Sequence, residues 1–175
     1  MQSAAFTSGP AAYSALLAGK AKITLVSKST GARFTYRICR AEQRRPGEAP
    51  AYFVSLLSGP NNESDFVYLG MLRKGWGNDG YRFTLTAKSR STMDAASVKA
   101  ISWAVATIYD RGEIPASLEV WHEGCCCRCG RTLTVPESLA TGLGPECAKK
   151  GSKAAPLLLP PTPRGYGPDR YPEAA

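Results

Sequence analysis

Histidine is the scarcest reactive residue in this sequence, which holds a single copy, His122, among 175 residues. One histidine cannot build a His-Glu-x-x-His zinc protease motif, and it leaves none for a Ser-His-Asp triad if His122 binds metal. A zinc deaminase needs His-x-Glu, whereas Glu123 directly follows His122. These absences predict a protein that is not an enzyme.

Long apolar runs are also missing. No stretch approaches the roughly 20 apolar residues that a membrane-spanning helix needs. Residues 1–18 contain no charged residue that could precede an apolar signal segment, and Ser8, Gly9, Pro10 and Ser14 interrupt their apolar run. We therefore expect neither a signal peptide nor a membrane partner, and a cytoplasmic location, where clustered cysteines bind metal more often than they form disulfides.

Acidic residues are outnumbered. The chain has 22 Lys and Arg against 14 Asp and Glu, a net charge of +8. Most of the excess lies in residues 1–121, with 15 basic and 9 acidic residues, a difference of +6. A polyanionic partner such as nucleic acid is one interpretation of this charge, and an ordinary basic protein is the other.

What the sequence does contain is a set of short alternating segments. In residues 32–39, Phe34, Tyr36 and Ile38 fall on one face, as expected for a strand whose side chains point alternately to its two sides. Similar patterns predict further strands over residues 21–28, 51–57, 65–72, 81–86 and 117–121. Cys39, at the end of the predicted strand over residues 32–39, is interpreted as a small core residue.

One longer segment, residues 92–111, has helical periodicity. Its apolar stripe consists of Val98, Ile101, Val105 and Ile108. Together with the strands, it predicts an α+β fold in which a small antiparallel sheet packs against one main helix over residues 20–121. The flanking segments are expected to be a flexible arm at 1–19, with a short helix near Tyr13 as the alternative, a zinc-binding module at 122–151, and a disordered, proline-rich tail at 152–175.

The cysteine-rich segment predicts a metal site. Cys126-x-x-Cys129 can reach one ion, and Gly130 allows the tight turn that such a pair requires. Cys147 follows Gly144-Pro145, which is typical of a helix start, and a pair of cysteines followed by a helix-borne ligand is treble-clef-like. His122 is the expected fourth ligand, which would complete a closed structural Zn²⁺ set.

The fourth ligand position has other candidates besides His122. Cys125 is the next candidate for the fourth position, and Cys127 has no C-x-x-C partner. Lys150 stands where a helix-borne second cysteine is often found.

The pattern Cys-x-Arg-Cys-Gly-Arg-x-Leu-Thr-x-Pro-x-Ser, followed by Gly-x-Gly-Pro-x-Cys, covers residues 126–147. It resembles a zinc-finger-like family of unknown function that is common in actinobacteria and their phages. Relatives often carry His-Glu-Gly before the first cysteine, which favours His122 as a ligand, whereas Cys125 and Cys127 replace other residues. The body, residues 20–121, looks like the N-terminal part of some phage and plasmid proteins of this group, and the resemblance implies no activity.

Two functions are compatible with these features. The first is nucleic-acid binding, with phosphate contacts from basic residues and base stacking on aromatic ones. The expected phosphate contacts are Arg33, Arg37, Arg82, Arg128, Arg131, Lys149 and Lys150. The expected stacking residues are Tyr36, Tyr81, Phe83, Trp76 and Trp103. The second is a protein-interaction module, for example a phage factor acting on a host protein.

A weaker third interpretation concerns residues 75–80, which match the G-x-G-x-x-G pattern. In a dinucleotide site this pattern opens a helix, but here a predicted strand follows it. We therefore interpret it as a hairpin loop, and binding of a small anion there is the least favoured function.

Overall fold

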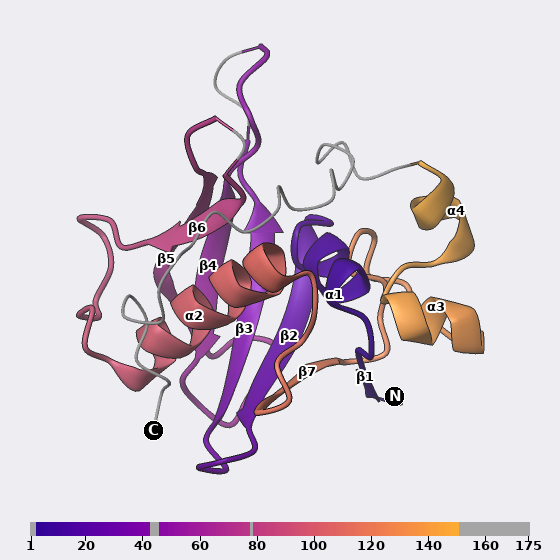
Figure 1. The fold of residues 1–175 in the computed structure, drawn as a ribbon, viewed down its shortest axis with the longest axis horizontal. Helices are drawn as coiled ribbons and strands as arrows, with labels where there is room; N and C mark the ends of the chain where they lie inside the picture. Colours follow the sequence, from indigo (N-terminus) through magenta and orange to yellow (C-terminus); the bar gives the residue numbers. More distant parts are fainter. Residues whose placement is uncertain (1–2, 43–45, 78, 151–175) are drawn as a thin grey trace.

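The computed structural model describes residues 3–42, 46–77 and 79–150. A seven-stranded antiparallel sheet forms its centre, in the order β1-β7-β2-β3-β4-β5-β6 (Figure 1). The strands are β1 (Ala4–Ala5), β2 (Lys20–Ser27), β3 (Arg33–Arg40), β4 (Tyr52–Leu57), β5 (Phe66–Lys74), β6 (Tyr81–Thr84) and β7 (Leu118–His122). The helices are α1 (Gly9–Leu16), α2 (Ala96–Arg111), α3 (Pro136–Thr141) and α4 (Pro145–Lys149). The predicted α+β fold with a cysteine-containing C-terminal region is confirmed.

One face of the sheet packs against α1 and α2 (Figure 1). The alternation in β2 and β3 places Ile23 and Ile38 on this face, and both are fully buried. The predicted stripe of α2, from Val98 to Ile108, is buried against them. The buried Tyr36 hydroxyl donates a hydrogen bond of 2.6 Å to the Ser97 carbonyl, which ties β3 to the start of α2. None of the helices in the described ranges is long and apolar enough to cross a membrane.

In the N-terminal segment, the structure has the short helix near Tyr13 that the sequence gives as the alternative to a flexible arm. Residues 4–5 pair with β7, and α1 follows with its Ala12 and Leu16 side chains buried in the core. Gly9 lies so close to the end of α2 that a Cβ there would be 2.6 Å from the Glu113 Cα. The Tyr13 hydroxyl accepts a hydrogen bond of 2.8 Å from the Tyr81 backbone N–H. Small residues allow this close packing, which composition alone does not reveal. The predicted tail at 152–175 lies outside the described residues.

The opposite face of the sheet bears none of the helices of the described chain, and we call it the helix-free face. Strand register places a set of polar, basic and aromatic side chains on it. They include Lys22, Thr24, Thr35, Arg37, Phe53, Ser55, Phe66, Tyr68 and Met71. A register shift between Val54 and Ser55 places both Met71 and Tyr68 of β5 on this side, opposite Phe53 and Ser55 of β4.

Candidate metal centre

A tight loop after β7 positions two of the cysteines. The Cys126 N–H donates to the Arg131 carbonyl at 2.8 Å, and the Gly130 N–H donates to the Cys126 carbonyl at 2.8 Å. Gly130 has a φ of 82°, a conformation that glycine adopts without a steric penalty. The loop therefore turns back on itself within five residues and brings Cys126 and Cys129 to one side.

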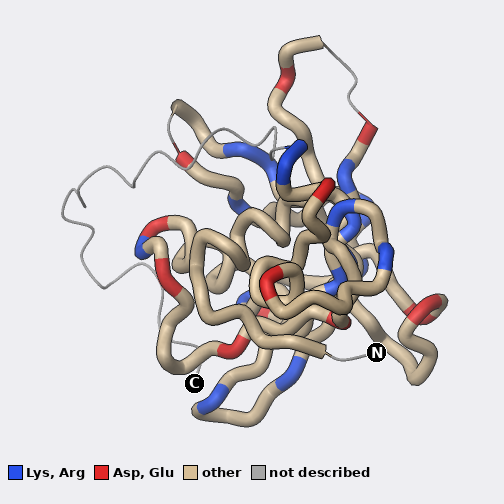
Figure 2. The backbone as a smooth tube through the Cα atoms, turned by 90° about the vertical axis from the view of Figure 1, so that its right-hand side faces the viewer, with Lys and Arg blue, Asp and Glu red and all other residues tan. Residues whose placement is uncertain are grey.

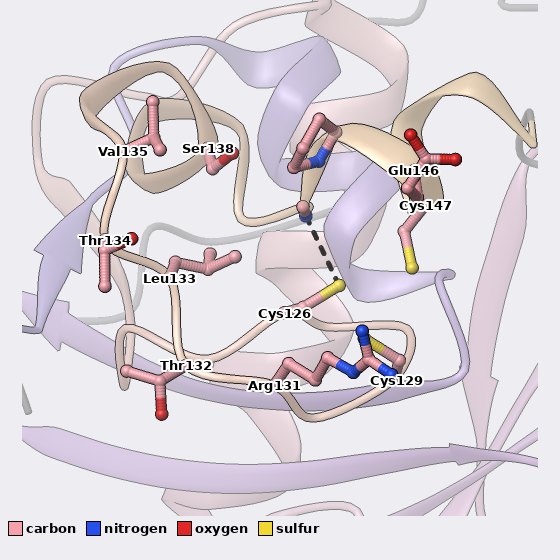
Figure 3. A pocket seen from close by; sticks show the side chains of 12 residues that line it. Cys126, Cys129, Arg131, Thr132, Leu133, Thr134, Val135, Ser138, Glu146 and Cys147 are labelled. Carbon is pink, nitrogen blue, oxygen red and sulfur yellow. Dashed lines mark hydrogen bonds between the residues drawn. The ribbon is translucent and has the colours of Figure 1, made fainter.

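The third cysteine comes from α4. Gly144 and Pro145 start this helix as the sequence predicts, and Cys147 lies in its first turn. The Sγ atoms of Cys126, Cys129 and Cys147 all lie within 4.8 Å of one another (Figure 3). A modest closing of the side chains would reach the spacing of about 3.8 Å that follows from Zn–S bonds of about 2.3 Å in a tetrahedron. The three thiols could thus hold a metal ion.

Backbone amides favour a thiolate at the centre of this group. Burial acts to raise the pKa of Cys126, but the N–H groups of Gly144, Cys129 and Arg128 outweigh it and lower that pKa to about 7. The Gly144 N–H lies 3.4 Å from the Cys126 Sγ. By contrast, partial burial and the two neighbouring thiols raise the pKa of Cys147 to about 11. A divalent cation would remove this mutual repulsion and favour three thiolates.

His122 does not join the cysteines, which corrects the expected fourth ligand. The side chain is 1% exposed, and both ring nitrogens have backbone partners. Nδ1 accepts a hydrogen bond of 3.2 Å from the Gly124 N–H, so the proton is on Nε2, which donates to the Leu139 carbonyl at 2.8 Å. The ring also packs on Phe6, with centroids 5.0 Å apart. His122 therefore connects β7 to α3 as a buried neutral side chain.

The remaining cysteines also lie apart from the group. Cys127 is part of the hydrophobic core, and burial raises the pKa of its thiol to about 12. Cys125 pairs with Thr132 in an isolated β-bridge. Cys39 is half-buried opposite Phe53 on the helix-free face, so the expectation of a core position for it is wrong.

The three sulfurs adjoin a pocket of about 210 Å³. Figure 3 shows Leu133 and Val135 on its wall, and Arg131 and Glu146 also line it. Cys129 is exposed and Cys147 half-buried, so the group opens to solvent on this side. No sequence signal indicated this pocket, because its wall comes from residues between 126 and 138 and from residues 144–147, which only folding brings together.

The basic residues expected to contact phosphates are not gathered into one surface, and Figure 2 shows Lys and Arg positions spread over the chain. Arg33 and Arg37 share the helix-free face of β3, but Arg82 lies beyond β4 and β5, on β6, and pairs with Asp110 at 2.7 Å. In the module, Arg128 donates to the Cys147 carbonyl, Arg131 lines the pocket, Lys149 pairs with Glu146, and Lys150 caps α4.

The aromatic residues expected to stack on bases are mostly interior. Tyr36, Tyr81 and Phe83 are buried, and Trp103 packs partly against the core. Trp76, in the loop between β5 and β6, is 95% exposed. The accessible aromatic residues of the sheet are instead those of the helix-free face.

Residues 116–151 match the model of a family of unknown function (DUF6011). The matched segment, 36 residues from 116 through 151, begins just before β7 and includes all three cysteines of the group. It supports the resemblance to a domain family without established activity. No curated protein and no solved structure matches the chain.

Proposed function

We propose that this protein is a non-enzymatic, zinc-binding protein that holds single-stranded nucleic acid on the helix-free face of its sheet. The observation that carries the proposal is the position of Arg37, whose guanidinium lies over the Phe66 ring at 4.4 Å from the centroid. Lys22 lies over the same ring at 5.9 Å. Aromatic faces beside cations are what single-stranded nucleic acid uses, since bases stack and phosphates need positive charge.

Three aromatic rings share the helix-free face, those of Phe53, Phe66 and Tyr68. Phe53 and Tyr68 meet edge to face with centroids 6.1 Å apart, and Phe53 is 44% exposed. Phe66 stands two residues before Tyr68 on β5 and therefore on the same face. A large apolar ring exposed to water on a sheet is a candidate binding surface, because burying it under a ligand is energetically favourable. The bases of an unpaired strand offer flat apolar faces, whereas the stacked bases of a duplex do not.

The cations on this face have partners that a phosphate can replace. Arg37 donates to the Glu63 carbonyl at 3.2 Å, and Lys22 donates to the Asn62 carbonyl at 3.0 Å. Lys22 also pairs with Glu123 at 2.7 Å. Because carbonyl oxygens are weaker partners than phosphate oxygens for these groups, phosphate contacts are expected to replace them. Arg33, which is exposed on the same face, extends the positive surface.

Zinc is the proposed ion because thiolate ligands in a reducing environment select zinc among the abundant divalent metals. Metal analysis of the purified protein tests this directly, and one zinc per chain is expected. A protein without bound metal that also fails to take up zinc would contradict the assignment. The phage origin suggested by the resemblance stays an expectation.

The test of nucleic-acid binding is a fluorescence anisotropy titration with a labelled single strand and the matching duplex. We expect tighter binding of the single strand, with affinity falling steeply between low and moderate salt. Phe66→Ala should weaken binding about 5- to 100-fold, since stacking contributes about 1–3 kcal/mol per base. Arg37→Ala should also flatten the salt dependence.

Matched controls come from the other side of the molecule. Met93→Ala removes an exposed apolar side chain, and Arg111→Ala removes an exposed cation at the end of α2. Both are expected to leave the affinity unchanged. Absence of binding at low salt, or equal losses in the control variants, would rule out the helix-free face as the interface. If the helix-free face binds a protein instead of nucleic acid, no binding of the labelled strand is expected at low salt.

A further inference from the structure

We infer that a metal ion held by Cys126, Cys129 and Cys147 keeps one coordination position for a ligand from outside the chain. The pocket beside the three sulfurs receives this ligand, which is a neutral donor of the imidazole class. The inference goes beyond nucleic-acid binding and rests only on metal binding by the three cysteines. It replaces the closed structural site that the sequence predicts with an open one.

No further thiol or imidazole of the described residues joins the group. It contains six cysteines and one histidine, and all seven lie in the described ranges. The four donors outside the group are His122, Cys125, Cys127 and Cys39. Both nitrogens of His122 are bonded to backbone groups, and Cys127 is buried in the core. Cys125 lies in its bridge with Thr132, and Cys39 lies on β3.

Carboxylates do not complete the set either. None of the Asp and Glu side chains of the described residues joins the three sulfurs. Glu146, which precedes Cys147, pairs with Lys149 at 3.2 Å. Figure 3 shows its carboxylate turned to the side opposite the Cys147 sulfur. Within the described residues, a tetrahedral ion bound here therefore has three donors, and one coordination position remains for another ligand.

The pocket gives that molecule a place to bind. Its volume of about 210 Å³ is several times the roughly 30 Å³ that one water occupies in the liquid. Leu133, Val135 and Pro145 provide apolar walls, which suit the carbon edge of a small ring. All three cysteines line the same pocket, so a ligand inside it can reach the ion.

Charge selects the class of ligand. Three thiolates around a divalent cation carry a net charge of about −1, which disfavours a further anion. Arg131 on the pocket wall offsets part of this charge, and the exposed Glu146 adds to it. A neutral nitrogen donor avoids the repulsion, and a histidine side chain of a partner protein is the macromolecular form of such a ligand.

Cobalt substitution of the full-length protein tests the inference. Co²⁺ bound by thiolates absorbs in the visible range, and its bands change when a fourth ligand is exchanged. We expect imidazole to shift these bands in a saturable titration with one imidazole per ion, and azide, an anionic probe, to bind at least about 10-fold more weakly because of the net negative charge. Cobalt uptake without any response to imidazole would overturn the open coordination position but not metal binding. Absence of cobalt uptake would overturn both.

Two variants sharpen the test. Cys125→Ser should leave the cobalt spectrum and the imidazole affinity unchanged; a spectrum that loses a thiolate in this variant would show that the chain supplies the fourth donor. Val135→Trp should fill the pocket from its exposed rim and weaken imidazole binding by at least about 5-fold while cobalt stays bound. Met93→Trp is the control for adding a bulky exposed residue, and equal affinity in both tryptophan variants would exclude the pocket as the entry route.

Discussion

The sheet with its two long helices and the cysteine module, residues 123–150, are held together by different forces. Every member of the hydrophobic core except Cys127 lies between Phe6 and Val120. In the module outside that core, the buried side chains are those of Cys126, Leu133 and Ser138. The body is therefore stabilised by apolar burial, whereas the module has too little of it to fold alone.

The two regions meet at a seam that the N-terminal segment builds. Phe6 packs on His122 of β7, and its ring lies so close to Gly142 of the module that a Cβ there would be 2.8 Å away. The Lys20 N–H donates to the Cys127 carbonyl at 2.7 Å, and the Cys127 N–H donates to the Gly142 carbonyl at 2.9 Å. The small module thus packs against the larger core, and metal binding is expected to supply the rest of its stability.

The largest expected effect is unfolding of the module while the body stays folded. Cys126→Ser should release the metal and unfold the module, because structural zinc supplies about 10–16 kcal/mol in small zinc domains. Hydrogen exchange is expected to show lost protection at Leu133 and Cys147, with protection in β3 and α2 retained. Cys125→Ser is the matched control. Retained protection in the module of Cys126→Ser would mean that the seam alone holds it.

Alkaline pH should unfold the body through its buried tyrosines. Burial raises the pKa of Tyr13 to about 12 and raises the pKa values of Tyr36, Tyr52 and Tyr81. Since the unfolded value is about 10, this stability is present below about pH 10 and is lost as the pH rises toward about 12, about 3 kcal/mol from Tyr13 alone. Circular dichroism should show cooperative unfolding in this range.

The alkaline prediction has an internal control. Tyr68→Phe, on the helix-free face, is expected to leave the pH midpoint unchanged, whereas Tyr13→Phe should shift it upward. Residues 123–150 contain no tyrosine, and high pH favours their thiolates. A body that remains folded at about pH 12 would contradict the role assigned to the buried tyrosines.

A comparable effect is expected at the seam. His122→Ala removes hydrogen bonds to Gly124 and Leu139 and leaves a cavity beside Phe6. The free energy of unfolding should fall by about 3 kcal/mol, measured by urea denaturation. The metal content should stay the same, because His122 is not a ligand. Loss of bound metal at full stability would restore His122 to the ligand set.

The smallest effect compares two glycines with positive φ. Gly142 has a φ of 67°, and a Cβ there would lie 2.8 Å from the Phe6 ring. Gly130 has a φ of 82°, and a Cβ added there would meet nothing within 4 Å beyond its chain neighbours. Gly130→Ala should cost about 1 kcal/mol from backbone strain alone, and Gly142→Ala about 2–3 kcal/mol because the seam must also shift. Thermal or urea unfolding of both variants measures the difference, and equal costs would argue against tight packing at the seam.

Much of the fold follows from short-range patterns. The alternation around Tyr36 predicts β3 nearly to its observed limits, and the stripe from Val98 to Ile108 predicts the buried face of α2. The predicted start of α2 at residue 92 is wrong, because the helix begins at Ala96 without a capping side chain. The α1 segment was harder to predict because Ala, Gly and Ser have little apolar contrast, and its burial depends on close approach to α2.

Local sequence patterns likewise predict some features of the candidate site and not others. The spacing of Cys126 and Cys129 and the Gly-Pro start before Cys147 predict three ligands, because a C-x-x-C turn and a helix start are local structures. The position of His122 depends on Leu139 and Phe6, which are distant from it in sequence. Accessible aromatic residues were also missed, because alternation assigns Phe53 and Tyr52 to opposite faces without showing which face the helices cover.

Local sequence patterns are enough to predict the strands between residues 20 and 122, the main helix, and the cysteine turn with its following helix. These depend on periodicity and spacing over a few residues, which the chain carries wherever it folds. Long-range packing makes His122 a buried connector, leaves Phe66 accessible beside Arg37, and places the three thiols beside a pocket. Each of these depends on contacts between segments far apart in sequence, and packing of the whole chain sets them.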